Sequence, residues 1–423
     1  MGPRLKLCLN EPGNGQYYVS NEAMSGNVVL ELDRPASIIS LSVTIRGTSQ
    51  TFTQSSGSDY LMHTTFGNRS CHTLVHQKQE LFPPENVRGA ITTSKKGFQV
   101  SKGLYSYGFE FLVPYWLKCF NDHGAKSAGF NRTLEDPRLP PSFNSDAATA
   151  GLVDFENSYY KMGSVTYYMK ATLVLGKIGF RLTPGNTIIE AYQGIEYIPT
   201  PRCDGNQAHI LQANIGPTQS FVSKKTLKVN DSLDAWIEVK ARSLSRVYRL
   251  DRMFQRGCQR FDKVSLVLSQ RPVQELNIKI RRLTLQLVEI MNYLSQGQVN
   301  AMVGTIPLVE TQLDLKLNSS KIKTLGNGTI EWPLELCRIP ELANYKFNEA
   351  NITHRGNKMF SFASCNIKRA FKFCLSLGLE IDGSRFDAEV LTTMCDIELS
   401  SIEDHEELPS YKVSDVPPNY TND

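Results

Sequence analysis

Apolar and polar residues alternate along much of the first 200 positions, and this alternation predicts β-strands. The clearest run spans 38–46, where Ile39, Leu41, Val43 and Ile45 are separated by polar residues. A period of two places these four side chains on one face of a half-buried strand. Similar runs predict further strands at 27–32, 105–113 and 165–175.

The second half of the chain has the same kind of pattern. Strands are predicted there at 232–239, 264–268, 276–280, 283–290, 306–317, 371–381 and 388–399. Short strands with frequent turn residues are typical of two packed sheets, and 423 residues exceed what one core usually serves. We therefore predict an all-β protein with two tandem β-sandwiches. The predicted division is 1–203, a linker at 204–216, a second sandwich at 217–400, and an acidic disordered tail at 401–423.

One segment of the second half departs from strand periodicity. Between 242 and 260, arginines recur at steps of three and four residues, which predicts a helix with a basic face. The arginines are Arg242, Arg246, Arg249, Arg252, Arg256 and Arg260. This face is either a solvated charged surface or a site for acidic phospholipid headgroups or acidic and phosphorylated cargo tails, because arginine suits phosphate.

Charge narrows the range of partners. The net charge of +4 is too small to indicate a nucleic-acid-binding protein. Residues 401–423 hold six acidic residues and one lysine, which leaves about +9 on the part before them. That part can therefore meet an anionic surface.

Cysteines, histidines and motifs give no sign of an enzyme. The nine cysteines are odd in number and include no Cys-x-x-Cys pair, so neither a disulfide framework nor a zinc site is predicted. His72 and His76 lie four apart beside Cys71, a spacing that could bind a metal on a helix, but no second ligand pair accompanies them. No apolar run is long enough to span a membrane. We expect a cytoplasmic protein without catalytic activity, cofactor or metal.

The tail carries the sharpest motif. Pro417, Pro418 and Tyr420 form a Pro-Pro-x-Tyr sequence, and proline holds the backbone close to polyproline II. WW domains bind such segments in an aromatic groove at little ordering cost. A weaker copy consists of Leu408, Pro409 and Tyr411, with leucine in place of the first proline.

Three segments of the first half carry a family resemblance. They are Tyr-Gly-Phe-Glu-Phe at 107–111 followed by Val-Pro, Leu-Pro-Pro-Ser-Phe at 139–143, and Val-x-Tyr-x-x-Lys-Ala at 165–171. Their order resembles the N-terminal domain of the arrestin family. Together with the Pro-Pro-x-Tyr motif, it is most similar to the alpha-arrestins, the arrestin-related trafficking adaptors. The resemblance covers about residues 20–400 and implies two immunoglobulin-like arrestin domains.

The resemblance also implies a function. Members of this family are adaptors that recognise cytosolic tails of membrane transporters and receptors and recruit a HECT-type ubiquitin ligase through its WW domains. Ubiquitin is then attached covalently to the cargo, which is endocytosed and sorted. The adaptor itself is cytoplasmic and is recruited to the plasma membrane and endosomes. The alternative is an arrestin-fold subunit of a sorting coat, similar to that of retromer, which binds coat proteins and no ligase.

Overall fold

The computed structural model describes most of the chain, and strands make up nearly all of the regular structure in this part. The described residues are 2–55, 66–88, 97–117, 119, 138–145, 163–176, 187–200, 221–230, 233–241, 247–250, 264–268, 277–317, 322–324, 330–334, 336, 339–343, 353–354, 357–391 and 396–399. The predicted linker at 204–216 and tail at 401–423 lie outside them.

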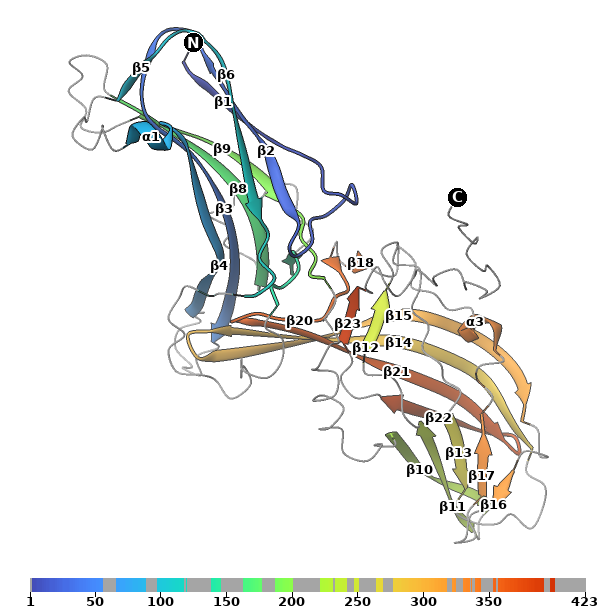
Figure 1. Ribbon diagram of the computed structural model, residues 1–423. Helices are drawn as coiled ribbons and strands as arrows, with labels where there is room; N and C mark the ends of the chain where they lie inside the picture. Colours follow the sequence, from blue (N-terminus) through green and yellow to red (C-terminus); the bar gives the residue numbers. More distant parts are fainter. Residues whose placement is uncertain are drawn as a thin grey trace, which may run out of the picture.

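The first β-sandwich is built from two sheets (Figure 1). Its strands are β1 Arg4–Leu9, β2 Ala23–Leu32, β3 Ala36–Ser55, β4 Phe66–Phe82, β5 Phe98–Val100, β6 Gly103–Leu112, β7 Phe143–Asn144, β8 Gly163–Leu175 and β9 Thr187–Ile195. One sheet has the order β1-β2-β6. The other has the order β4-β3-β8-β7, with β5 paired to β3 and β9 paired to β8.

Alternation along the sequence explains how these strands bury one face. The alternate residues of β8 all lie in the core, each at most 4% exposed: Val165, Tyr167, Met169, Ala171 and Leu173. Strand β6 likewise buries Phe109 and Phe111. The strands predicted at 27–32 and 165–175 are therefore confirmed within longer elements, and the one predicted at 105–113 is confirmed as β6, which ends at Leu112.

Strand β3 departs from the predicted face at its beginning. Leu41, Val43 and Ile45 are buried as expected, but Ile38 is buried in place of Ile39. The register of β3 against β8 shifts between Ile38 and Ser40. An irregularity of one residue reverses the facing of the residues before it, so the prediction for Ile39 is wrong.

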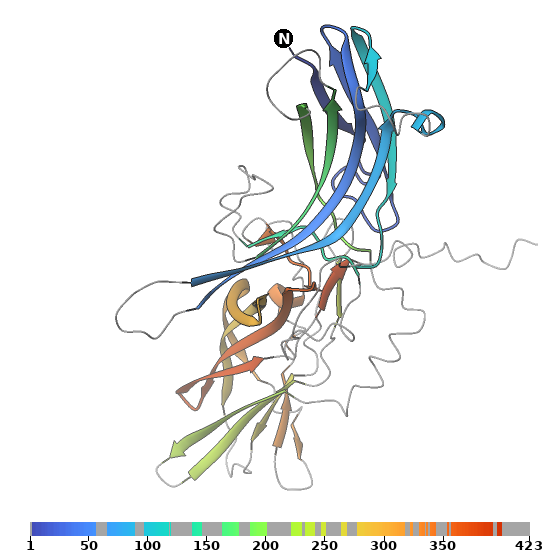
Figure 2. The ribbon, with the colours of Figure 1, turned by 90° about the vertical axis from the view of Figure 1, so that its left-hand side faces the viewer.

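The second β-sandwich lies in the other half of the molecule (Figures 1 and 2). One sheet is β10-β11-β13-β17-β16, and the other is β15-β14-β21-β20 with β22 paired to β21. The strands are β10 Phe221–Asn230, β11 Leu233–Ala241, β12 Val247–Leu250, β13 Val264–Leu268, β14 Ile278–Ser295, β15 Gln298–Lys316, β16 Lys323–Thr324, β17 Ile330–Pro333, β18 Thr353–His354, β19 Asn357–Lys358, β20 Phe362–Ala363, β21 Ile367–Ile381, β22 Ser384–Leu391 and β23 Asp396–Leu399.

Strand bounds in this half shift from the predicted ones, and in two places the predicted segments divide into strands differently. The strands predicted at 276–280 and 283–290 form the single strand β14, which continues through a register shift between Ile280 and Arg282. A bulge accommodates the basic pair at 281–282 without ending the strand. The strand predicted at 388–399 divides into the end of β22 and the separate strand β23.

The helix predicted from the arginine spacing is wrong at Val247–Leu250, because these residues form β12. This strand pairs in parallel with β23, and Arg249 lies opposite Glu398 in the register. Valine and tyrosine at 247 and 248 favour a strand, and charge spacing alone does not outweigh this preference. The rest of 242–260 lies outside the described residues.

Hydrophobic packing crosses from one half of the molecule to the other. No described strand of β1–β9 pairs with one of β10–β23. Even so, the first core includes Met291, Tyr293 and Ile367 from the second half, and the second core includes Tyr17 and Ile198 from the first. The two sandwiches therefore share side chains where they meet, and the domain boundaries remain predictions.

Helix is scarce in the described chain. The short helices are α1 Glu85–Arg88 and α3 Pro340–Ala343. Within the described residues, no helix has the length and apolar character needed to cross a bilayer.

Candidate functional site

The structure leaves most of the predicted binding residues undescribed. Both WW-binding motifs fall after 399, outside the described residues: Leu408, Pro409, Tyr411, Pro417, Pro418 and Tyr420. Arg249 lies in β12. The remaining basic residues, Arg242, Arg246, Arg252, Arg256 and Arg260, lie outside the described chain. The described candidate features therefore belong to the two β-sandwiches, above all to the junction between them.

A buried polar cluster joins β3 of the first half to the turn between β20 and β21 in the second. Ser49 Oγ donates to Asn366 Oδ1 at 2.5 Å and lies 3.1 Å from Ser364 Oγ. Asn366 Nδ2 donates to the Ser49 carbonyl and to Thr51 Oγ1, both at 3.2 Å. Ser49 and Asn366 are fully buried, so these bonds form away from competing water.

The hairpin of β14 and β15 makes a second polar contact with the first half. Thr51 Oγ1 donates to the Leu294 carbonyl at 2.6 Å, and Asn68 Nδ2 donates to Gln298 Oε1 at 2.9 Å. The hairpin turns at Gln296 and Gly297, whose φ angles of 48° and 84° are both left-handed. Such a two-residue turn suits the twist of antiparallel strands. It brings the hairpin tip beneath the ends of β3 and β4 (Figure 1).

A close contact and a buried ion pair complete the junction. A Cβ atom on Gly163 would lie 2.3 Å from Tyr293 Cε1, so only glycine fits where β8 meets β14. Arg369 donates from Nε to Glu289 Oε1 at 2.7 Å, with both side chains almost fully buried. The Arg369 guanidinium also lies 5.3 Å from the ring centre of Phe143 in the first half. Burial lowers the pKa of Arg369, and the charge of Glu289 opposes that shift.

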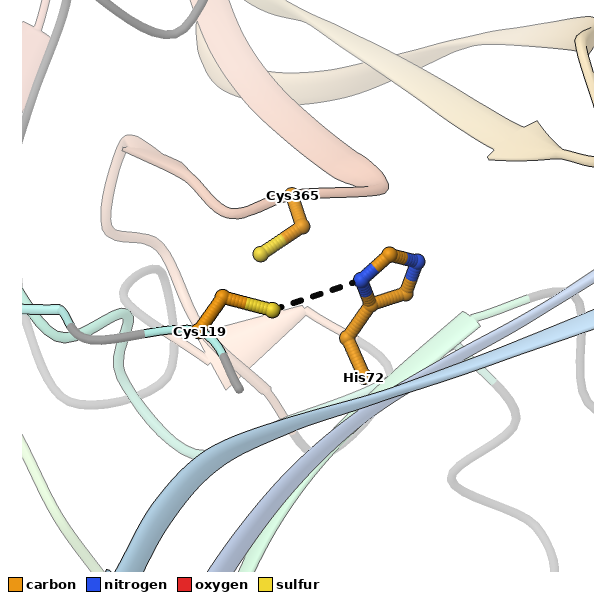
Figure 3. A group of neighbouring side chains, drawn as sticks. All are labelled: His72, Cys119 and Cys365. Atoms are coloured by element: carbon orange, nitrogen blue, oxygen red, sulfur yellow. Dashed lines mark hydrogen bonds between the residues drawn. The ribbon is translucent and has the colours of Figure 1, made fainter. Parts of the chain in front are cut away.

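Three side chains with nitrogen or sulfur atoms that can bind a metal lie close together beside this junction, as Figure 3 shows. His72 comes from β4, Cys119 follows β6, and Cys365 lies in the turn between β20 and β21. Their donor atoms all lie within 4.8 Å of one another. Cys119 Sγ is 3.5 Å from His72 Nδ1.

His72 and His76, the pair whose spacing was weighed and set aside in the sequence, do not come together in the structure. Both lie on strand β4 and not on a helix, and a register shift after Gly47 inserts Leu74 as an extra residue between them. Consecutive burial of Leu74 and Val75 marks this bulge. As a result His72 and the exposed His76 point to opposite faces.

The long outer edge of the second half is formed by β15. Within the described residues this strand pairs with β14 alone, which leaves its other edge without a strand partner. Val299, Val303 and Leu315 are 42%, 69% and 37% exposed on it. An exposed edge with apolar side chains is a place where an extended peptide can add as a strand.

Sequence reasoning missed the junction residues because their partners are distant in the chain. Ser49 and Asn366 are 317 positions apart, and neither belongs to a motif. Cysteine spacing could not reveal Cys119 and Cys365 as neighbours for the same reason. Only the turn-forming polar residues at 364–366 gave a local signal that a loop ends there.

Comparison with known proteins agrees with this architecture. Residues 9–175 match the model of the arrestin (or S-antigen) N-terminal domain, and residues 215–402 match that of the Arrestin-related trafficking adapter 10 C-terminal domain. Two β-sandwiches with these matches define a two-domain protein of the arrestin fold.

Full-length relatives narrow the class further. Arrestin-related trafficking adapter 10 of Lachancea thermotolerans is 30% identical over 426 residues, which cover 99% of each chain. The protein of that name from Saccharomyces cerevisiae is 30% identical over 522 residues, covering all of this chain and 99% of the relative. The chain belongs to the family of arrestin-related trafficking adapters, and the predicted family is confirmed.

Proposed function

We propose that this protein is a ubiquitin-ligase adaptor that recruits a HECT-type ligase through its Pro-Pro-x-Tyr motif. The observation that carries the proposal is the motif at Pro417, Pro418 and Tyr420 in an acidic tail behind two arrestin domains. Family membership supports a trafficking role, and the motif supplies chemistry that WW domains bind. Holding ligase and cargo together raises their effective concentration, and this is the adaptor's contribution to ubiquitination.

Binding of isolated WW domains to the full-length protein tests this proposal. Tyr420→Ala should weaken binding about 30-fold, since an aromatic anchor contributes about 2 kcal/mol. Adding Tyr411→Ala should remove what remains. Asn419→Ala is the matched control, because the third motif position contributes no anchor, and its affinity should equal that of the unmodified protein. Unchanged binding by the double tyrosine variant would contradict ligase recruitment and favour the sorting-coat alternative.

Cargo recognition is proposed to use the body of the protein. Strand addition would use the β15 edge, where Val303 is 69% exposed. Charge complementarity would use the basic segment 242–260, which also suits acidic phospholipid headgroups and would recruit the adaptor peripherally to the plasma membrane and endosomes. The two modes are compatible, because strand addition recognises the backbone of the cargo tail and the basic segment recognises its negative charge.

Liposome co-sedimentation tests the basic segment. Vesicles of phosphatidylcholine with phosphatidylserine should bind the protein, and replacing Arg246, Arg249 and Arg256 with glutamate should abolish binding. The control reverses three exposed charges of the first half: Arg4, Arg34 and Lys102. It makes the same change in net charge. Equal loss in both variants would show attraction by net charge alone, and no loss in the first would remove the segment from the proposal.

A further inference from the structure

The cluster of His72, Cys119 and Cys365 lies across the junction of the two halves. Two of its members belong to the first arrestin domain, whereas Cys365 comes from the second (Figure 3). Cys365 is 4% exposed and Cys119 is half-buried. Imidazole and thiolate are the donors that zinc binds in proteins.

The turn that carries Cys365 is held in place by its neighbours. Ser364 and Asn366, on either side, both contact Ser49 Oγ. Ser49 lies directly opposite His72 in the register of β3 and β4. The bonds that fix the turn on β3 therefore hold the Cys365 thiol next to the His72 ring, so the donors are brought together without a metal.

A hydrogen bond to Ser70 suits His72 to the role of ligand. His72 Nε2 lies 2.8 Å from Ser70 Oγ, while Nδ1 faces Cys119 Sγ. In the tautomer with its proton on Nε2, that proton is donated to Ser70, and Nδ1 presents its lone pair toward the sulfur atoms. Histidines that bind metals are commonly oriented by such a bond from the second ring nitrogen.

We propose that His72, Cys119 and Cys365 form a zinc site that ties the two arrestin domains together. In tetrahedral zinc, donor atoms about 2.0–2.3 Å from the metal lie about 3.6 Å from one another. The 3.5 Å separation of Cys119 Sγ and His72 Nδ1 already meets this requirement. The remaining donor distances, below 4.8 Å, need only small side-chain rotations.

Zinc binding at this site balances in charge and in protons. The two thiols each release a proton, and two thiolates neutralise Zn²⁺ while the imidazole stays neutral. Three protein ligands leave the fourth tetrahedral position to water. Because the ligands come from both halves, zinc stabilises only the docked arrangement, and unfolding or undocking releases it.

Metal content and cobalt spectroscopy of the full-length protein test the site. Protein purified under reducing conditions and dialysed against zinc should hold one equivalent by mass spectrometry of the metal. Cobalt in its place should give thiolate-to-metal charge-transfer bands and the visible bands of tetrahedral coordination. Cys365→Ser and Cys119→Ser should each lose the equivalent and the bands. Cys71→Ser, which alters an exposed cysteine beside His72, is the control and should retain both.

Thermal unfolding keeps the test decisive if one variant folds poorly. Zinc should raise the Tm of the unmodified protein and of Cys71→Ser, and chelation should reverse the rise, whereas Cys119→Ser should show no response. A zinc response that survives in Cys119→Ser overturns the proposal. A Cys119–Cys365 disulfide in the protein as isolated, with no zinc bound after reduction, also overturns it.

Discussion

Replacing Asn366 with alanine tests whether buried hydrogen bonds hold the two halves together. Asn366 is fully buried, and its amide group makes three bonds across the junction, two to Ser49 and one to Thr51. Each bond contributes about 1 kcal/mol net. The substitution also leaves buried polar groups of β3 short of a partner and opens a small cavity, so the free energy of unfolding should fall by about 3–4 kcal/mol.

Urea unfolding measures this loss. Trp116 in the first half and Trp332 in the second report both domains through fluorescence. With a urea m-value of about 3 kcal/mol/M or more for a chain of this size, the midpoint should fall by about 1 M. Asn10→Ala is the matched control, because Asn10 makes an exposed bond to Ser25. It should cost less than about 0.5 kcal/mol.

A double-mutant cycle separates the junction bonds from a general effect of lost volume. Ser49→Ala and Asn366→Ala remove the two ends of the same contact, so their coupling energy should be about 1–2 kcal/mol. Additive effects would show that the two side chains act independently. A fall in the free energy of unfolding below about 0.5 kcal/mol for Asn366→Ala would refute the reasoning, because losing a buried amide with three hydrogen bonds should destabilise the protein by more than this.

Three further predictions follow from the described contacts. Gly163→Ala should destabilise the protein by about 1–3 kcal/mol in urea unfolding, because its methyl group would overlap Tyr293. Glu289→Gln should cost about 3–5 kcal/mol in the same assay, since it leaves the buried Arg369 without its counter-charge. Burial, reinforced by Glu389, raises the pKa of Cys374 to about 12, so iodoacetamide should alkylate it slowly in the native protein and rapidly in urea. The stability from this thiol is fully present below about pH 9, the ordinary pKa of cysteine, and declines as the pH rises toward 12.

The two substitutions have matched controls in the same fold, and the Cys374 prediction is checked by the native alkylation rate. Gly108→Ala should be well tolerated, because the added atom would lie 3.7 Å from its nearest neighbour. Asp387→Asn breaks the exposed pair with Arg282 and should cost less than about 1 kcal/mol. A Glu289 variant no less stable than this control would show that Arg369 finds another partner. Rapid native alkylation of Cys374 would show that the strand opens locally.

Prediction from sequence succeeded where burial follows a local period. Strand β8 is evident from alternate residues between Val165 and Leu173, since one face meets the core and the other does not. Strand β4 gives no such signal, because it lies at a sheet edge and is held mainly by its pairing with β3. The alternation of apolar and polar residues was misleading at Ile39 and between His72 and His76. At both places a bulge of one residue reverses the sheet face on which the side chains lie.

The candidate site was less predictable than the fold because its contacts are long-range. The Pro-Pro-x-Tyr motif can be recognised from sequence because proline restricts the backbone locally, without any contact from a distant part of the chain. The junction between Ser49 and Asn366 depends on two domains having already folded and docked. The arginine spacing was misread as a helix at Val247–Leu250, because pairing with β23 decides that segment and lies 149 positions away.

The polar character of the junction bears on how an adaptor would work. Apolar surfaces allow small slides with little change in free energy, whereas the buried hydrogen bonds between Asn366 and Ser49 are satisfied in one arrangement of the halves only. The two halves should therefore move as one body, which fixes where a bound cargo tail projects. Under the proposed function, the 17 residues between Leu399 and the motif at Pro417 would limit the distance to a bound ligase to at most roughly 60 Å of fully extended chain. In that proposed arrangement a rigid body with a short connection would keep the ligase concentrated near its cargo, since effective concentration falls as the connecting chain lengthens.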